Sequence, residues 1–196
     1  HGMDLPTNVY PLFAQALRKE EKKTAATHLD ECSALFSEFS KIASKNPYSW
    51  FPSYRSATEI AQETSNNRMV GFPYTKYLNS VIRVNMASAF ILMSQSKADE
   101  LYVAENKRVY VHGCSILNDI WNVTERPDFH SSPAIKTCVN QSLDQAEISL
   151  SDIKHFDLYS CFPSAVQIAI RELEIPEEKK DLTVTGGLPY FGGPGN

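Results

Sequence analysis

The stretch of the chain with the most chemical potential is FDLYSCFPSAVQIAIRELEI, residues 156–175, where a tyrosine, a serine and a cysteine precede a predicted helix. A helix that begins at Pro163 points its free backbone N–H groups toward Cys161, which stabilises a thiolate and lowers the pKa of the thiol. The alternative is a small thiol buried beneath the helix. Spacing alone favours the buried thiol, and Tyr159, Ser160 and Cys161 form the first candidate site.

A second candidate site is the segment GGLPYFGGPGN at the end of the chain. It holds five of the eight glycines, namely Gly186, Gly187, Gly192, Gly193 and Gly195. Glycine lets the backbone approach a ligand closely, and exposed amides can hold a phosphate or an oxyanion. The segment lacks the GxxxxGK[ST] pattern, so it does not predict a nucleotide P-loop. A cluster of ordinary turns is the alternative, and composition does not separate the two.

The cysteines and histidines show no CxxC or HExxH spacing, and the sequence therefore predicts no metal site. Cys32 and Cys138 fall on the apolar stripes of predicted helices, which favours buried reduced thiols in a cytoplasmic protein over disulfides. His112 lies on a predicted strand, where a histidine is more often satisfied within the fold than placed in a cleft.

The elements that must position these residues differ between the two parts of the chain. Helical spacing of apolar residues predicts helices over residues 10–17 and 27–43, the second with Thr27 and Asp30 as a capping pair. Residues 47–80 lose this periodicity and gain proline, tyrosine, serine and asparagine. A long segment that is rich in aromatic residues indicates a functional or partner-contacting loop, because disordered linkers are poor in them.

After this loop the pattern alternates between short apolar runs and amphipathic segments. Strands are predicted at 87–93, 108–114, 155–161 and 182–187, and helices at 96–101, 133–148 (with Ser132 as the N-cap) and 163–175. This order predicts an α/β fold with a mostly parallel sheet and covering helices. Ligands bind at the carboxyl ends of such strands, and both candidate sites follow one.

The composition is that of an ordinary globular protein, with 196 residues, 42% hydrophobic residues and a net charge of -4. Such a charge does not indicate a nucleic-acid partner. No apolar run approaches the ~18 residues of a membrane span, and no signal peptide is recognisable. His1 and Gly2 before Met3 resemble a cloning scar, so residues 1–3 are left out of the fold.

Three segments together resemble the thiolase superfamily, and in particular the thiolase-like branch near the sterol carrier protein thiolases. VNMASAFILMSQSKADEL resembles the V-N-D-G-A-A-A-L-V-L-M-S segment of thiolases. SPAIKTCVNQSLDQAEISLSDIKHFDLYSCFPSAV is similar to the segment that ends in N-E-A-F or H-D-C-F, and VTGGLPYFGGPGN to N-G-G-(x)-A-(x)-G-H-P-(x)-G. The resemblance covers roughly the last 110 residues, in matching order.

The resemblance implies a fragment of a thiolase-like fold, with a mixed, mostly parallel sheet, covering helices and a helical and irregular loop subdomain. The loop subdomain corresponds to residues 4–83, the end of the N-terminal thiolase half to 84–106, and a truncated C-terminal domain to 107–196. It further implies that the complete protein forms a homodimer.

The activity implied is acyl transfer between coenzyme A thioesters, as in an acetyl-CoA acetyltransferase, with acyl-CoA as substrate and no covalently bound cofactor. This chemistry needs a thiolate, a base and oxyanion holes. The acylated cysteine of the family lies upstream of the matching segments, and the histidine of G-H-P is replaced by Gly193. Tyr159 and Ser160 replace the first two residues of H-D-C-F, and Cys161 is kept. These four residues are the catalytic candidates.

For coenzyme A itself, the resemblance directs attention to PYTKYLNS, just before the V-N-D-like segment. The candidate contacts there are Lys76, Tyr77, Asn79 and Ser80, to which the glycine-rich segment adds Gly192. A lysine suits a phosphate group. Because the motif histidine is missing, a non-catalytic acyl-CoA or lipid-binding module that works with a partner is the alternative function.

Overall fold

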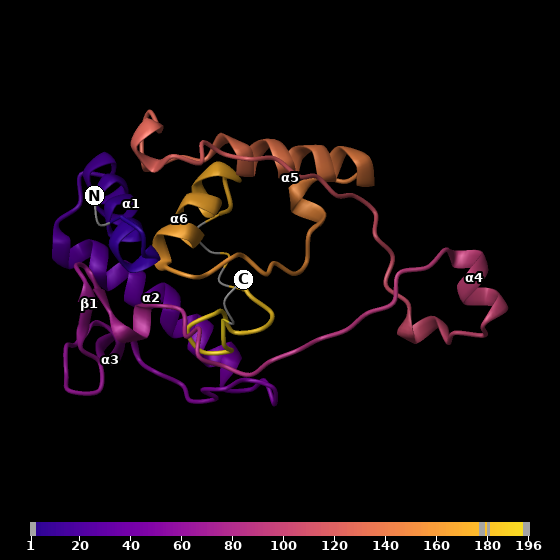
Figure 1. Cartoon of the computed structure of the whole chain (residues 1–196), viewed down its shortest axis with the longest axis horizontal. Coiled ribbons are helices and arrows are strands. Elements are labelled where there is room, and N and C mark those ends of the chain that lie inside the picture. The colour runs from indigo at the N-terminus through magenta and orange to yellow at the C-terminus, as the bar shows by residue number, and fades with distance from the viewer. Residues whose placement is uncertain (1–2, 177–178, 180, 194–196) are drawn as a thin grey trace.

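The computed structural model of the chain describes residues 3–176, 179 and 181–193. Residues 1–2 of the suggested cloning scar and Gly195 of the glycine-rich segment lie outside this range. The described part is rich in helices, and Figure 1 shows most of them gathered in one body. The α-helices are α1 (Pro6–Glu20), α2 (Ala25–Ala43), α3 (Ala57–Ala61), α4 (Gln95–Glu100), α5 (Pro133–Ala146) and α6 (Pro163–Glu172).

The first two helices confirm the predicted segments and extend them. Both begin earlier than the apolar spacing indicated, because a terminus is set by capping groups and the apolar stripe marks only the buried face. In α2 the side chain of Thr24 accepts the backbone N–H of Thr27 at 3.1 Å. The predicted capping pair of Thr27 and Asp30 is therefore wrong, since the N-cap lies three residues earlier.

The segment predicted as one long irregular loop contains short elements of its own. Helix α3 is followed by strands β1 (Met69–Gly71) and β2 (Tyr74–Thr75), which pair antiparallel, and by a 3-10 turn at Lys76–Leu78. These elements are too short to leave a periodic signal in the sequence. Of the predicted loop, residues 47–56 before α3 form no helix or strand.

The later helices confirm the predictions more closely, because proline fixes where two of them start. Helix α5 begins at Pro133 and α6 at Pro163. Ser132 is the N-cap of α5, but its hydroxyl donates to Asp119 at 2.6 Å and does not cap the helix. Further 3-10 turns lie at Glu105–Lys107, Val123–Glu125 and Leu150–Asp152.

The four predicted strands are not strands in the described structure, whose one sheet is the β1–β2 pair. A strand requires a neighbouring backbone to complete its ladder of hydrogen bonds. Segments 155–161 and 182–187 share one such bond, from the N–H of Leu158 to the carbonyl oxygen of Leu182 at 3.0 Å. Neither segment forms a ladder.

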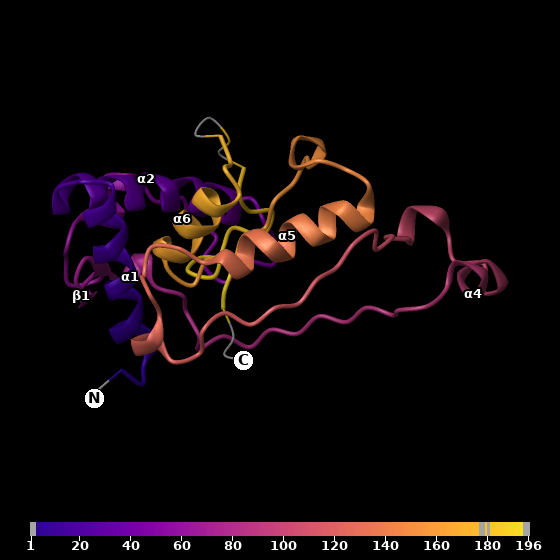
Figure 2. The same cartoon turned by 90° about the horizontal axis from the view of Figure 1, so that it is seen from above.

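The other two segments belong to a long excursion of the chain. Between the 3-10 turn at Lys76–Leu78 and α5, the backbone leaves the helical body, reaches α4 at the far end of the molecule and returns (Figures 1 and 2). Phe90, Ile91 and Val109 are at least 83% exposed on this excursion. The prediction that 87–93 is a covered strand is therefore wrong, because no described part of the chain covers it.

The core lies where α6 packs against α1, α2 and α5. Its buried residues come from both ends of the chain, and they include Phe36, Phe39, Tyr74, Phe162, Val166, Leu182 and Tyr190. All four cysteines are free, with Cys32 buried and Cys138 half-buried, in line with the predicted reduced thiols. Within the described residues, no helix has both the length and the apolar character that a membrane crossing requires.

Candidate functional site

The candidate cysteine lies at the entrance to α6, but it is buried. Cys161 is 5% exposed and Ser160 is 1% exposed, whereas the side chain of Tyr159 is 60% exposed. The first turn of α6 is also occupied, because the N–H of Ser164 donates to the hydroxyl of Tyr74 at 3.2 Å. The helix terminus is thus partly satisfied within the protein.

Two tyrosines determine the electrostatic surroundings of this thiol. Burial raises the pKa of Cys161 above its usual value, while hydrogen bonds with the side chains of Tyr10 and Tyr159 oppose the rise. Burial also raises the pKa of both phenols, that of Tyr159 to about 12. At neutral pH the site therefore holds a protonated thiol between two protonated hydroxyls.

This arrangement decides between the two interpretations that the sequence offered. A helix N-terminus lowers the pKa of a cysteine that precedes it, but at Cys161 burial has the larger effect and raises the pKa. The structure therefore favours the buried-thiol interpretation over an activated thiolate. The catalytic role assigned to Cys161 through the family resemblance stays a prediction.

Three segments that are distant in the sequence meet at this point through backbone hydrogen bonds. The N–H of Ser80 donates to the carbonyl oxygen of Cys161 at 3.0 Å. The N–H of Val81 donates to the carbonyl oxygen of Leu188 at 3.3 Å, and the N–H of Gly193 donates to that of Val81 at 3.0 Å. The predicted coenzyme A segment thus joins both the cysteine and the glycine-rich turn.

A buried serine completes this junction, which consists of the segments Ser80–Val81, Ser160–Cys161 and Leu188–Gly193. The hydroxyl of Ser160 accepts the backbone N–H of Leu188 at 3.0 Å. Gly187 stands beside it with φ +76°, and an added Cβ there would lie 2.5 Å from the Phe39 ring. Only glycine combines this left-handed backbone with so little space. The glycine-rich segment is therefore a tight turn that closes on Ser160.

The position that carries a histidine in the thiolase motif is closed to a side chain. A Cβ added to Gly193 would lie 2.9 Å from the Cβ of Leu188. A larger side chain would have to displace Leu188, which the hydrogen bonds to Ser160 and Val81 hold in place. This geometry provides no room for an imidazole at residue 193 as the turn stands.

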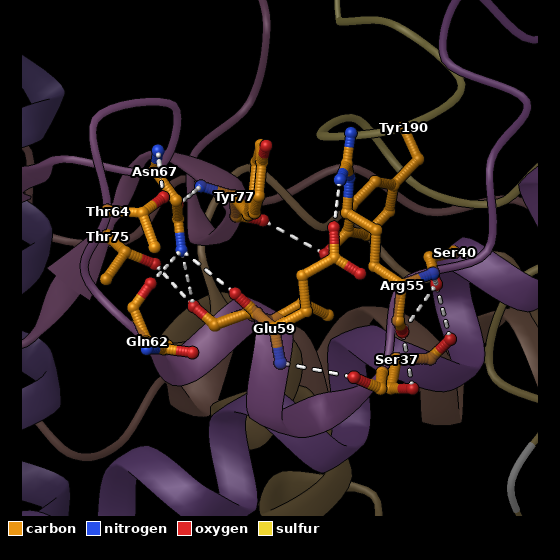
Figure 3. A network of polar contacts seen from close by, with 12 residues as sticks. Ser37, Ser40, Arg55, Glu59, Gln62, Thr64, Asn67, Thr75, Tyr77 and Tyr190 are labelled. Carbon is orange, nitrogen blue, oxygen red and sulfur yellow. Dashed lines mark hydrogen bonds and ion pairs between the residues drawn. The ribbon is translucent and has the colours of Figure 1, made fainter.

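The predicted coenzyme A segment is held by a polar network, shown in Figure 3. The amide of Asn67 accepts the N–H of Tyr77 at 2.9 Å and donates to three backbone carbonyls, at 2.9 to 3.2 Å. The hydroxyl of Tyr190 donates to the carbonyl oxygen of Tyr77 at 3.0 Å. The guanidinium of Arg55 lies 3.9 Å from the Tyr77 ring centroid, within cation–π range.

The four candidates in this segment have different surroundings. Lys76 is exposed, and its ammonium is available to an anionic ligand. Tyr77 is half-buried in the network of Figure 3. Asn79 is buried and donates to the carbonyl oxygen of Thr75 at 2.6 Å, which is a structural contact. Ser80 is half-buried and contributes its backbone to the junction.

A cavity of about 860 Å³ adjoins the junction on the side of the aromatic loop. Leu188 and Gly192 belong to both the junction and the cavity wall. The remaining wall residues come from the loop after α2, the start of the long excursion, the segment before α6 and the C-terminal segment: Asn46, Tyr48, Trp50, Asn85, Met86, Ala87, Ser88, Asp157, Thr185 and Phe191. Its size is in the range of small-molecule sites.

One group of potential metal ligands occurs in the described part of the chain, at the connection between α1 and α2. Glu21, His28 and Glu31 bring their ligand atoms within 4.8 Å of one another. The ammonium of Lys23, however, lies 2.9 Å from Glu21 and 2.6 Å from Glu31. Because this lysine already supplies the positive charge, we assign no metal to the group.

The structure brings together most of the residues that the sequence singled out. Ser160, Cys161, Ser80, Gly192 and Gly193 lie in or beside the junction, and their proposed roles stay predictions. Sequence reasoning missed several others that take part in the site: Tyr10, Val81, Met86 and Leu188. Trp50 belonged to the aromatic loop that was predicted to be functional, whereas Tyr10 carried no signal beyond its place at the start of a helix.

Comparisons with known proteins identify the fold. Searches with protein-family models and among curated proteins returned no match. Among solved structures, the chain is similar to a monomeric SCP2-thiolase-like protein type 1 from Mycobacterium smegmatis, with 35% identity and a TM-score of 0.86. The match covers 98% of this chain and 43% of that chain.

The chain therefore has the fold of part of an SCP2-thiolase-like protein, and the predicted thiolase-like α/β fold class is confirmed. It spans less than half the length of that protein. That protein is described as monomeric. The homodimer, the domain division at residues 83 and 106, and the cytoplasmic location that we expected stay predictions.

Proposed function

We propose that this chain is the acyl-CoA-binding part of a thiolase-like protein. The observation that supports the proposal is the meeting of the Ser80–Val81, Ser160–Cys161 and Leu188–Gly193 segments beside a cavity of about 860 Å³. Exposed Lys76 precedes this meeting point along the chain and would pair with a phosphate of coenzyme A. The thioester would lie at the junction.

Binding without covalent transfer agrees best with the chemistry of the site. The thiol of Cys161 is buried with a raised pKa, and a thiol must lose its proton to attack a thioester. Residue 193 is a glycine in a closed turn and supplies no base. The chain would thus bind an acyl thioester without taking over its acyl group, as a module that works with a partner.

Acyl transfer, as in an acetyl-CoA acetyltransferase, is the second candidate function. It is favoured by one observation, the placement of the Tyr10 and Tyr159 hydroxyls against Cys161, because both oppose the effect of burial on the thiol. In that case the thiol of Cys161 would lose its proton and take the acyl group from the thioester, which releases free coenzyme A. Tyr159 would act as a hydrogen-bond donor toward the thioester oxygen.

Calorimetric titration of the purified protein with coenzyme A and acetyl-CoA tests the binding proposal. We expect saturable binding that Lys76→Ala weakens and that Lys107→Ala, at an exposed position on the long excursion, leaves unchanged. Intact mass measured after the same incubation separates the two candidates. A mass gain of one acyl group on a cysteine would establish transfer, whereas binding without any gain would support the module.

A further inference from the structure

The aromatic loop after α2 is attached to the glycine-rich turn. The N–H of Trp50 donates to the carbonyl oxygen of Phe191 at 3.0 Å, and that of Phe51 donates to Tyr190 at 3.0 Å. The side-chain amide of Asn46 donates to the carbonyl oxygen of Thr185 at 3.1 Å. Three hydrogen bonds thus hold the loop as a fixed wall of the 860 Å³ cavity.

Gly192 is the point where the apolar side chains of this wall converge. A Cβ added there would lie 2.6 Å from the Met86 sulfur and 3.4 Å from both Trp50 and Val84. Gly192 also has φ +125°, a backbone conformation that favours glycine. The absence of a side chain leaves space in which Trp50 and Met86 form an apolar surface next to the turn.

We propose that this cavity binds the apolar acyl chain of the thioester, and that Trp50 and Met86 determine how long a chain is preferred. The inference rests on the proposed binding of acyl-CoA at the junction. Leu188 connects the junction to the cavity, because its backbone is hydrogen-bonded to Ser160 and Val81 and the residue also lines the cavity. An acyl chain attached to a thioester at the junction enters the cavity past Leu188.

The chemistry of the walls favours this cavity over its neighbour. A second cavity of about 390 Å³ adjoins Tyr159, but its wall contains the ion pair of Arg126 and Asp119, at 3.0 Å. An apolar chain there would strip water from two charges, which is costly. The larger cavity has one charged residue in its wall, Asp157, which is exposed and accepts hydrogen bonds from the hydroxyls of Thr183 and Thr185.

The test compares the affinities of the purified full chain for acetyl-CoA and octanoyl-CoA by calorimetry. Each methylene group that becomes buried tightens binding about fourfold. Octanoyl-CoA is therefore expected to bind at least about tenfold more tightly than acetyl-CoA. Trp50→Ala should remove this preference, and Trp50→Phe, which keeps an aromatic wall, should retain most of it.

The matched control is Tyr54→Ala, since Tyr54 is an exposed aromatic residue of the same loop that does not line the cavity. It should keep the octanoyl preference. Equal affinities of the wild type for both thioesters, or a preference that survives Trp50→Ala, would overturn the acyl-chain inference and leave the proposed function intact. Failure of every acyl-CoA to bind would instead refute the proposed function, and this inference with it.

Discussion

The hydroxyl of buried Ser160 accepts the backbone N–H of Leu188 at 3.0 Å, which joins the entrance of α6 to the glycine-rich turn. Through this bond, the segment just before α6 fixes the position of the turn that contains Leu188. Leu188 in turn borders the cavity and closes residue 193 to a side chain. The Ser160 hydroxyl therefore holds the candidate site together with the backbone hydrogen bonds of Ser80, Val81 and Gly193.

Ser160→Ala tests this relationship. The substitution leaves the N–H of Leu188 without its acceptor, and an unsatisfied donor in a partly buried site costs about 1–2 kcal/mol of the free energy of unfolding. Urea denaturation measures the loss, and calorimetry measures the accompanying fall in acyl-CoA affinity. Ser53→Ala, at an exposed loop position, is the control and should leave both values unchanged. Equal behaviour of the two variants would contradict the role of the hydroxyl.

Asn67→Ala tests whether the network in Figure 3 supports the coenzyme A segment. Asn67 is 1% exposed and links Tyr77 to the carbonyls at the end of α3. Removing its amide leaves several buried backbone groups without partners, so we expect a loss of about 2–3 kcal/mol in the free energy of unfolding. Urea denaturation at neutral pH measures it.

The neighbouring residue provides the control for that experiment. Asn66 is exposed, and Asn66→Ala should change the stability by less than about 0.5 kcal/mol. If both variants unfold at the same urea concentration, the network does not hold the segment. A stable Asn67→Ala protein with reduced coenzyme A affinity would show a local effect on residues 76–80.

The sequence predicted the helices well because their signals are local. Pro133 and Pro163 mark the starts of α5 and α6, and an apolar stripe from Cys32 to Ala43 marks the buried face of α2. Strands depend on a second backbone that the sequence does not specify. The apolar run 87–93 has the composition of a covered strand, yet Phe90 is 90% exposed.

The site was predictable only in part, for a related reason. Tyr159, Ser160 and Cys161 stood out because their types and their place before a helix are visible in one segment. The contact of Ser80 with Cys161 joins positions far apart in the chain, and no periodicity indicates such a pairing. The raised pKa of Cys161 has burial as its largest cause, and burial depends on packing between segments that are far apart in the chain.

Cysteine labelling tests the electrostatic assignment of the thiol. Burial holds the pKa of Cys161 above its usual value, so the thiolate fraction at pH 8 is smaller than for an ordinary thiol, and the side chain is also shielded. Cys114 is exposed and serves as the internal reference. We expect iodoacetamide to modify Cys114 at least about tenfold faster than Cys161, as read by peptide mass mapping.

The same reaction in denaturant provides the control, because all four cysteines should then react at similar rates. Cys161 reacting as fast as Cys114 in the folded protein would contradict the buried-thiol assignment. It would also strengthen acyl transfer as the function, since a reactive thiolate is what that chemistry requires.

Gly193→His tests whether the missing motif histidine can be restored. The new Cβ would meet that of Leu188 at 2.9 Å, and overpacking of this kind costs about 1–3 kcal/mol of the free energy of unfolding. Leu188→Ala removes the opposing Cβ substituents and should relieve part of the clash. We therefore expect the double variant to be more stable than the sum of the two single effects predicts, which a double-mutant cycle in urea measures. Additive effects would mean that the turn accommodates the imidazole without any movement of Leu188. Lack of space would then not be the reason why residue 193 is a glycine.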